Sequence, residues 1–424
     1  MDYTYIKILV DILIPSEIDS YEKWLDIGKC LADIDVELLD IWIFFNEKNS
    51  SLYDREYCVA VWNKFIVAEP KYSICTLNYL AKLCNSVEFG EMKNFIRSET
   101  LKNINCSFYE VAQLVDEEFK YCLRYVASDF YYFNGRWSKL ANIDSIYDSM
   151  IKILGTGQLV NRLSDFEFRC GVTKCLRRLL CCDKVMDDKR NLICFENGVW
   201  DTDYFRLGYP DDQVSLSVGY DNVSLKMNRE NVLNRNIVPE INSYLDNLMQ
   251  SSDDKNILLG VLADAIFGSY NESELYVLVG YPITLIIRFM EFIASVFGEY
   301  FGYAGNSVIV NGKYDRCEFK RGVRLYLLDQ VSETDICTTK YLEQFNSRNQ
   351  LYKGEIYRPQ FKTFLISDMA PTINSLYQNK VHQINFNPTF LSNMDNIMKY
   401  RDKFPLWKGV FMSMLIDYKR NIVY

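Results

Sequence analysis

Apolar residues recur at every third or fourth position along the N-terminal part of the chain, which is the spacing of one face of a helix. The clearest stripe consists of Trp24, Ile27, Leu31 and Ile34. Ser20 precedes this stripe and can cap its helix, and further helices are expected around Trp42 and Trp62. A polar, weakly periodic stretch follows at 98–105. The sequence therefore predicts a helical N-terminal domain over 1–97 that ends in a linker.

The pattern becomes mixed beyond this linker. An aromatic run at 130–133 predicts a short strand, and Asn134-Gly135 after it favours a tight turn. A second apolar run at 192–195 is followed by Asn197-Gly198 in the same way. Short strands with turn signals between helical stretches predict an α+β middle domain over 98–250.

Helices and strands alternate from residue 251 onward. A helical stripe of Ile257, Val261 and Ala265 ends at Gly268. Strands are expected at 275–279, 323–328, 361–367 and 381–386, and helices at 287–297 and 340–345. This alternation predicts a mostly parallel sheet with helices on both faces. We assign it to an α/β domain over 251–395, followed by a helical extension over 396–424.

Charge and composition narrow the class of protein. The 424 residues include 47 Lys and Arg against 56 Asp and Glu, which gives a net charge of −9, and 49% of the residues are hydrophobic. This composition excludes a disordered chain. An acidic chain also lacks the overall positive field that attracts nucleic acid, so any contact with nucleic acid has to be local.

The cysteines and the single histidine argue against a metal site. None of the 13 cysteines has the spacing of a zinc motif. The densest group is Cys170, Cys175, Cys181 and Cys182. His382 is the only histidine, and we expect it to be structural.

Two further features predict the compartment. The apolar N-terminal run contains acidic residues, unlike a secretory signal. The apolar run at 275–287 is shorter than the roughly 20 residues that a membrane span needs. We expect an intracellular protein with reduced thiols, neither secreted nor inserted in a membrane.

The turn after the expected strand at 275–279 is where a sheet of this kind cradles phosphates. Read against the pattern GxxxxGK[ST], the turn keeps only the first glycine, Gly280. The positions of the second glycine, the lysine and the hydroxyl hold Leu285, Ile286 and Ile287. Such side chains neither replace glycine's backbone freedom nor neutralise a phosphate or ligate magnesium. The motif is degenerate, and we expect these side chains to belong to the core.

Several longer phrases occur in a recognisable order. The phrase at 21–31, followed by 39–42 and 58–62, is similar to a primase C-terminal helical domain. The phrase at 192–201 is similar to a helicase-associated domain, and 253–280 is similar to the approach to a P-loop. In this order the chain resembles the helicase half of the poxvirus-type viral primase-helicases, a branch of the superfamily 3 helicases. The resemblance implies an AAA+-like C-terminal domain of a hexameric ATPase, with no primase catalytic domain in this chain.

The resemblance also places the remaining ATPase motifs. Asp329 matches an acid of the Walker B motif, and Gln330 replaces the glutamate that polarises water. Asp368 stands where a sensor asparagine is expected, and Asn379-Lys380 stands where the family tends to carry consecutive arginines. Both aspartates also have a simpler interpretation as caps at strand ends. We expect no catalytic residue and no cofactor, neither ATP nor Mg²⁺.

A cluster of basic residues is the candidate for contacts with nucleic acid. The cluster consists of Lys313, Arg316, Lys320, Arg321 and Arg324. Lys353 and Arg358 flank Gly354 at the place where the resemblance implies a DNA-contacting hairpin. Because Asp315 and Glu318 are interleaved with the cluster, solvated charge at a sheet edge remains an alternative interpretation.

Two classes of function follow. In the first, the chain is a catalytically degenerate oligomer, a hexamer in its relatives, that serves as scaffold or accessory factor in viral genome replication or particle assembly. Its partners would be viral replication or structural proteins, in the host cytoplasm or nucleus or in the virion. In the second, it is an atypical ATP-dependent DNA helicase that uses ATP and Mg²⁺ with displaced residues. The degenerate motifs favour the first.

Overall fold

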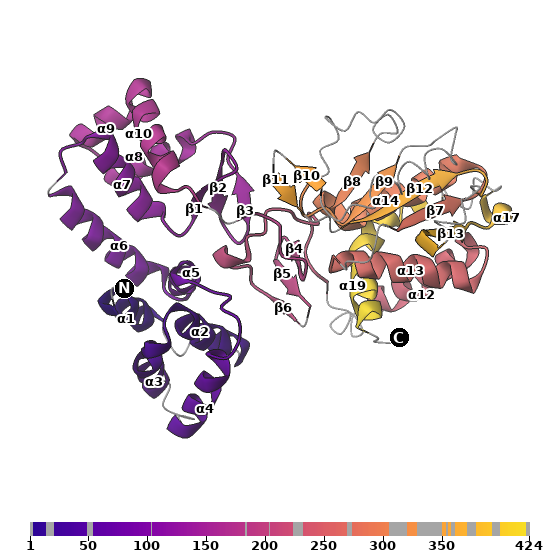
Figure 1. Cartoon of the computed structure of the whole chain (residues 1–424), viewed down its shortest axis with the longest axis horizontal. Helices are drawn as coiled ribbons and strands as arrows, with labels where there is room; N and C mark the ends of the chain where they lie inside the picture. Colours follow the sequence, from indigo (N-terminus) through magenta and orange to yellow (C-terminus); the bar gives the residue numbers. More distant parts are fainter. Residues whose placement is uncertain are drawn as a thin grey trace. The chain divides into compact units, whose positions relative to one another are not determined.

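The fold is described from a computed structural model (Figure 1). It describes residues 3–13, 21–48, 54–102, 104–182, 185–202, 204–223, 232–268, 274–304, 320–328, 350–352, 355–357, 361–370, 379–391 and 399–420. The chain forms two compact units. The first consists of 1–185 and 209–215, and the second of 186–208 and 216–424. The predicted middle domain, 98–250, is therefore divided between the two units.

The first unit begins with a helical subdomain. Its helices are α1 (Tyr3–Ile12), α2 (Tyr21–Ile34), α3 (Leu39–Lys48), α4 (Arg55–Phe65), α5 (Ile74–Cys84) and α6 (Ser86–Leu101), with a short 3₁₀ helix at Val36–Leu38. Asp54, Ser73 and Asn85 cap α4, α5 and α6 through their side chains. The helices enclose a core that includes Trp42 and Phe45. Because α6 continues through Leu101, the expected linker at 98–105 is partly helical.

The rest of the first unit surrounds a small antiparallel sheet. Its elements are α7 (Phe108–Phe119), β1 (Leu123–Val126), β2 (Asp129–Phe133), β3 (Trp137–Lys139), α8 (Asp144–Leu154), α9 (Gln158–Leu163) and α10 (Phe166–Leu179). The strand order is β1-β2-β3, and Phe133 pairs with Trp137 across the turn that Asn134-Gly135 predicted. Gly135 has a φ of 81°, a conformation that favours glycine. A second core lies between α7, α8 and α10.

The segment 209–215 returns to the first unit and contains a 3₁₀ helix at Pro210–Asp212. Asp211 is 2% exposed. It accepts hydrogen bonds from the Ser73 N–H at 2.7 Å and from Thr76 Oγ1 at 2.8 Å, both at the start of α5. Arg124 Nη2 on β1 lies 3.6 Å from the same carboxylate. One buried acid thus joins the helical subdomain to the small sheet.

The described part of the second unit contains three sheets. Its elements are β4 (Leu192–Phe195), β5 (Gly198–Asp201), β6 (Phe205–Arg206), α12 (Val232–Leu248), α13 (Ser252–Ile266), β7 (Leu275–Val279), α14 (Ile283–Phe297), a 3₁₀ helix (Gly298–Tyr300), β8 (Phe301–Ala304), β9 (Leu325–Leu328), β10 (Gln350–Tyr352), β11 (Glu355–Tyr357), β12 (Lys362–Ser367), β13 (Val381–Asn385), α17 (Pro388–Leu391) and α19 (Phe404–Lys419). β4, β5 and β6 are antiparallel. β10 and β11 form a separate antiparallel pair, and the five-stranded sheet has the order β13-β7-β12-β9-β8 with each neighbouring pair parallel. The expected parallel sheet and the multidomain fold class are confirmed, while the expected helix at 340–345 lies outside the described residues.

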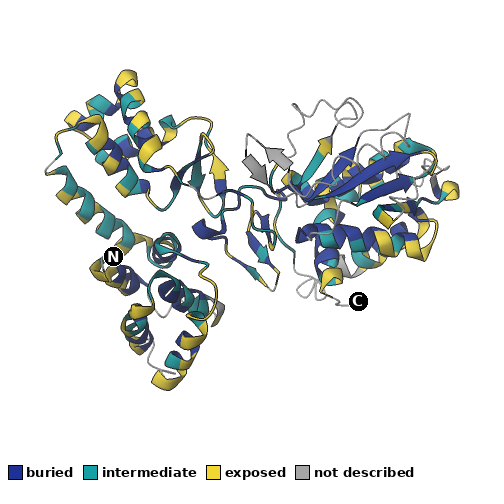
Figure 2. Ribbon diagram, in the orientation of Figure 1, coloured by how far each residue is buried: buried dark blue, intermediate teal, exposed yellow. Residues whose placement is uncertain are grey.

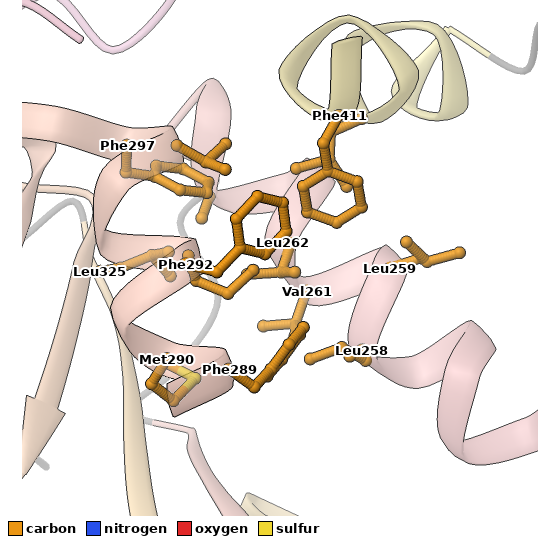
Figure 3. Close-up of a cluster of buried hydrophobic side chains, with 14 of the residues drawn as sticks. Leu258, Leu259, Val261, Leu262, Phe289, Met290, Phe292, Phe297, Leu325 and Phe411 are labelled. Carbon is orange, nitrogen blue, oxygen red and sulfur yellow. The ribbon is translucent and has the colours of Figure 1, made fainter. Parts of the chain in front are cut away.

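The core of the second unit lies between this sheet and helices α13, α14 and α19. In Figure 2 the central strands are buried along their length. Figure 3 shows Leu262 of α13, Phe292 of α14 and Phe411 of α19 packed together, and the rings of Phe292 and Phe411 lie 5.4 Å apart. The segment 396–424, expected as an extension, therefore contributes α19 to this core. Among the described residues, no helix is both long and apolar enough to cross a membrane.

Candidate functional site

The turn between β7 and α14 is the candidate nucleotide site. β7 ends at Val279 and α14 begins at Ile283, so only 280–282 connect them. The positions that correspond to the second glycine, the lysine and the hydroxyl of the P-loop pattern therefore lie within the helix. A phosphate-binding loop needs backbone that curves around the phosphates before the helix starts. This connection is too short to do so.

Two backbone donors around the turn, those of Gly280 and Leu285, are engaged within the protein. The Gly280 N–H donates to the Ser367 carbonyl at the end of β12, at 3.1 Å. The Leu285 N–H donates to the Pro282 carbonyl at 3.2 Å, and Pro282 has no N–H. These positions offer no free donor to a phosphate. The Pro282 cap also supplies no side-chain hydrogen bond to the helix.

The side chains at the motif positions fill the core. Leu285 is 4% exposed and Ile286 is fully buried, and both belong to the core of the second unit. Ile283 and Ile287 are half-buried and pack against the same core. The start of α14 is thus anchored by apolar contacts. A lysine in the place of Ile286 would have to bury its ammonium group among them.

The ends of the neighbouring strands provide few groups for catalysis. Asp368 directly follows β12 and is exposed, while Ser367 Oγ donates to the Met369 carbonyl at 2.6 Å. Asp329 and Gln330 follow β9 but lie outside the described residues. The described part of this edge therefore carries the exposed Asp368 and the buried Asp254, whose Oδ1 accepts from the Asn385 N–H at 2.7 Å at the end of β13.

Arg324, a candidate for nucleic-acid contacts, is 1% exposed. Its Nη2 donates to the carbonyls of Lys189 at 3.1 Å and Leu192 at 3.2 Å. Burial lowers the pKa of its guanidinium to about 10. Gly268, with a φ of +50°, leaves room for Nη1, with which any side chain there would collide. The candidate assignment of Arg324 is therefore corrected, because the buried side chain anchors the β4 region and cannot reach a phosphate.

The rest of the basic cluster is only partly described. Lys320 is exposed, and its N–H donates to Tyr326 Oη at 2.7 Å. Arg321 is 11% exposed and lies 3.6 Å from Asp188. The remaining candidates, Lys313, Arg316, Lys353 and Arg358, lie outside the described residues. The hairpin that the resemblance implied is present, because β10 and β11 are antiparallel on either side of 353–354.

A polar cluster that the sequence did not predict lies at the opposite, N-terminal ends of the strands. Lys362 Nζ lies 2.9 Å from Glu274 Oε2, and Tyr276 Oη donates to the same oxygen at 2.7 Å. His382 Nε2 lies 3.7 Å from Glu274 Oε1, and its ring stacks on Tyr276 at 5.0 Å. His382, then Lys362 and Tyr276, lower the pKa of Glu274 to about 2. Only the pairing of the strands brings these residues together, so spacing along the chain gives no signal for them.

Metal ligands do not gather in the described part of the chain, where no group of three or more His, Cys, Asp or Glu residues could hold an ion. Cys170 and Cys181 are exposed, Cys175 and Cys182 are half-buried, and none of these four forms a disulfide within the described residues.

Residues 6–81, which span most of α1 to α5, match the family Primase C terminal 2 (PriCT-2). Over 98% of its length the chain is 24% identical to a protein of Acanthamoeba polyphaga mimivirus named "Putative helicase L207/L206". The chain spans about half of that relative, 50% of its length. These two matches confirm that the chain resembles the viral primase-helicases, as the order of its sequence phrases predicted.

Solved structures give a looser likeness. An A-form apo structure of the NrS-1 C-terminal region aligns with 73% of this chain and 68% of its own, at 10% identity and a TM-score of 0.41. Another apo structure of that region aligns with 70% of this chain and 69% of its own, at 10% identity and a TM-score of 0.38.

Proposed function

We propose that this relative of the viral primase-helicases is catalytically degenerate and acts as an oligomeric scaffold or accessory factor in viral genome replication or particle assembly. The connection from β7 to α14 carries this proposal. Its backbone is too short to cradle phosphates, the Gly280 N–H is engaged by Ser367, and Ile286 lies in the core. The phosphate-binding motif is thus degenerate in its backbone as well as in its side chains.

Phosphoryl transfer depends on groups that this turn lacks. In P-loop enzymes the loop amides and the lysine hold the β- and γ-phosphates, and a hydroxyl holds Mg²⁺. These groups stabilise charge at the transferred phosphoryl group, and together they supply most of the rate acceleration. Asp368 is an anion and cannot replace a lysine at this place. Turnover of ATP at this turn therefore lacks its main source of stabilisation.

A role in assembly needs only surface packing. The parallel sheet and its helices form a complete core with apolar residues at the motif positions. The fold can therefore be stable without nucleotide, and its outer faces remain available for copies of the chain or for viral replication and structural proteins. Nucleic acid would be bound through the exposed Lys320 and the hairpin of β10 and β11, after oligomerisation concentrates such contacts.

Magnesium-dependent ATP hydrolysis by the full-length chain tests the proposal. We expect phosphate release no faster than in buffer, with or without single-stranded DNA. Light scattering should show an oligomer whose mass does not depend on ATP. Hydrolysis that requires Mg²⁺ and scales with protein concentration would instead support the alternative, an atypical helicase that uses ATP and Mg²⁺ with displaced residues. A strict monomer at all concentrations would contradict the scaffold.

A further inference from the structure

A cavity of about 460 Å³ lies within the first unit, which does not contain the β7–α14 turn. One wall comes from α5 and α6, and the other from the end of α7, the segment 121–122 that follows it, and β2 (Figure 1). The volume is in the range of sites for small organic ligands, about 300 to 1,000 Å³. Its walls combine aromatic rings with cationic side chains, and these decide which ligand fits.

Lys93 of α6 is the most informative residue of the lining. Its Nζ donates to the Glu117 carbonyl at 2.6 Å and lies 5.4 Å from the ring centre of Tyr121. No carboxylate in the described part of the chain lies within ion-pair distance of it. Burial lowers the pKa of Lys93, and the more distant carboxylates of Glu118 and Glu117 offset this only in part. A half-buried ammonium with unused donors at a cavity wall is a place for an anion.

The other charges of the lining leave the cavity positive. Lys82 is exposed at its wall and has no ion-pair partner among the described residues. Arg97 is neutralised, because its Nη1 lies 2.8 Å from Glu118. Burial raises the pKa of the Cys122 thiol to about 11, so this residue adds no negative charge near neutral pH. Lys82 and Lys93 therefore have no ion-pair partner among the described residues, in a chain whose net charge is −9.

The aromatic part of the lining offers flat apolar surface beside these cations. Tyr79, Phe89 and Tyr132 are half-buried at the cavity, and Tyr79 meets Phe133 edge to face at 5.0 Å. Asn134 and Ser86 are exposed in the lining and can reach polar edges of a ligand. Aromatic rings hold nucleobases by stacking, at about 1–3 kcal/mol per base, while lysines hold phosphate.

We infer that this cavity binds a nucleoside phosphate, with the phosphate at Lys93 and Lys82 and the base against the rings of Tyr79, Phe89 and Tyr132. A carboxylate ligand without a planar body would leave the rings unused, and an uncharged base would leave Lys93 uncompensated. The same chemistry is presented by a free nucleotide and by one residue of a single strand. The inference concerns the first unit and does not depend on the degenerate turn of the second.

The experiment uses the full-length chain and fluorescence anisotropy with a labelled oligothymidylate at low salt, with thymidine monophosphate and triphosphate as competitors. In Lys93→Met the affinity should fall by about tenfold or more, since hydrogen bonds to charged groups contribute about 1.5–3 kcal/mol each. Lys102→Met is the matched control. Lys102 directly follows α6, lies outside the cavity lining, is 64% exposed and is paired with Glu99, so its loss should leave the affinity unchanged.

Competition distinguishes a free nucleotide from a single strand as the ligand, and the melting temperature distinguishes loss of binding from misfolding. Competition by the mononucleotides at micromolar concentration assigns the site to free nucleotide, whereas binding of the oligonucleotide without competition assigns it to single strands. The melting temperature of Lys93→Met should not fall, because a desolvated ammonium is removed, and this excludes misfolding as the cause. Equal affinities for the two lysine variants, or no binding of either probe, would overturn the inference. ATP hydrolysis bears only on the proposed function, so the two can fail separately.

Discussion

Glu274 gathers most of the polar contacts at the start of the central sheet, where Lys362, Tyr276 and His382 meet it. Lys362 is 4% exposed, so this carboxylate takes the place of water beside its ammonium group. Replacing Glu274 by glutamine would leave the buried ammonium without its partner, which is a costly change in a protein interior. At the scale of single residues, this cluster therefore sets a dependence of stability on pH.

The pKa of Glu274 is about 2 in the folded protein, against an ordinary value of 4.5. A lowered pKa stabilises the fold above 4.5, and the contribution is lost as the pH falls toward 2. We expect Glu274→Gln to lower the free energy of unfolding at pH 7, and the gap to the unchanged protein to narrow below pH 4.5. Urea unfolding across this pH range measures the two free energies of unfolding. Glu291→Gln, at an exposed position, is the control. A gap that stays constant down to pH 3 would contradict the assignment.

At the scale of elements, periodicity predicted those segments whose burial is regular. β7 occupies the expected 275–279, and β12 and β13 lie within a residue of their expected ranges. α14 begins at Ile283 and not at 287, because the apolar residues of the motif positions continue its buried face. β8 was not predicted, because its four residues, which include Gly302, are too few to show a periodic pattern of apolar positions.

The site was predictable in its side chains but not in its backbone. The sequence shows directly that Leu285 and Ile286 stand where a P-loop needs glycine and lysine. The hydrogen bond from the Gly280 N–H to Ser367 and the burial of Arg324 arise from contacts between residues far apart in sequence. No spacing rule reports such contacts, and so the exposed charge expected at Arg324 was wrong.

Restoring the motif residues tests whether the connection between β7 and α14 has lost the phosphate-binding loop in addition to the motif side chains. We expect Leu285→Gly, Ile286→Lys and Ile287→Thr together to give no ATP hydrolysis, because the helix already starts at Ile283. Ile286→Lys alone should destabilise the protein by about 3 kcal/mol or more, since it buries an ammonium in the core. Thermal unfolding and phosphate release measure the two effects. Thr284→Lys, exposed on the same helix, is the control and should have little effect. Activity in the triple variant would show that the turn can still open into a loop.

At the scale of the molecule, the segment 209–215 decides the integrity of the first unit. We expect Asp211→Ala to lower the free energy of unfolding of this unit by about 3 kcal/mol, because Ser73, Thr76 and Arg124 lose a buried acceptor. Urea unfolding followed by tryptophan fluorescence measures this. The exposed Glu99→Ala should leave stability nearly unchanged. An equally small effect of Asp211→Ala would mean that α5 and β1 hold together without it.

This discontinuous arrangement also sets an order of events during synthesis. The chain leaves the first unit after Val185, contributes 186–208 to the second, and returns for 209–215 before leaving again. The helices α1 to α6 emerge from the ribosome well before Asp211, which lies 138 residues after Ser73 in the chain. At about 5–20 residues per second, α5 waits for many seconds without its buried acid. A ribosome that stops between 185 and 209 therefore presents an incomplete unit to chaperones, and no single cut in the chain separates two finished halves.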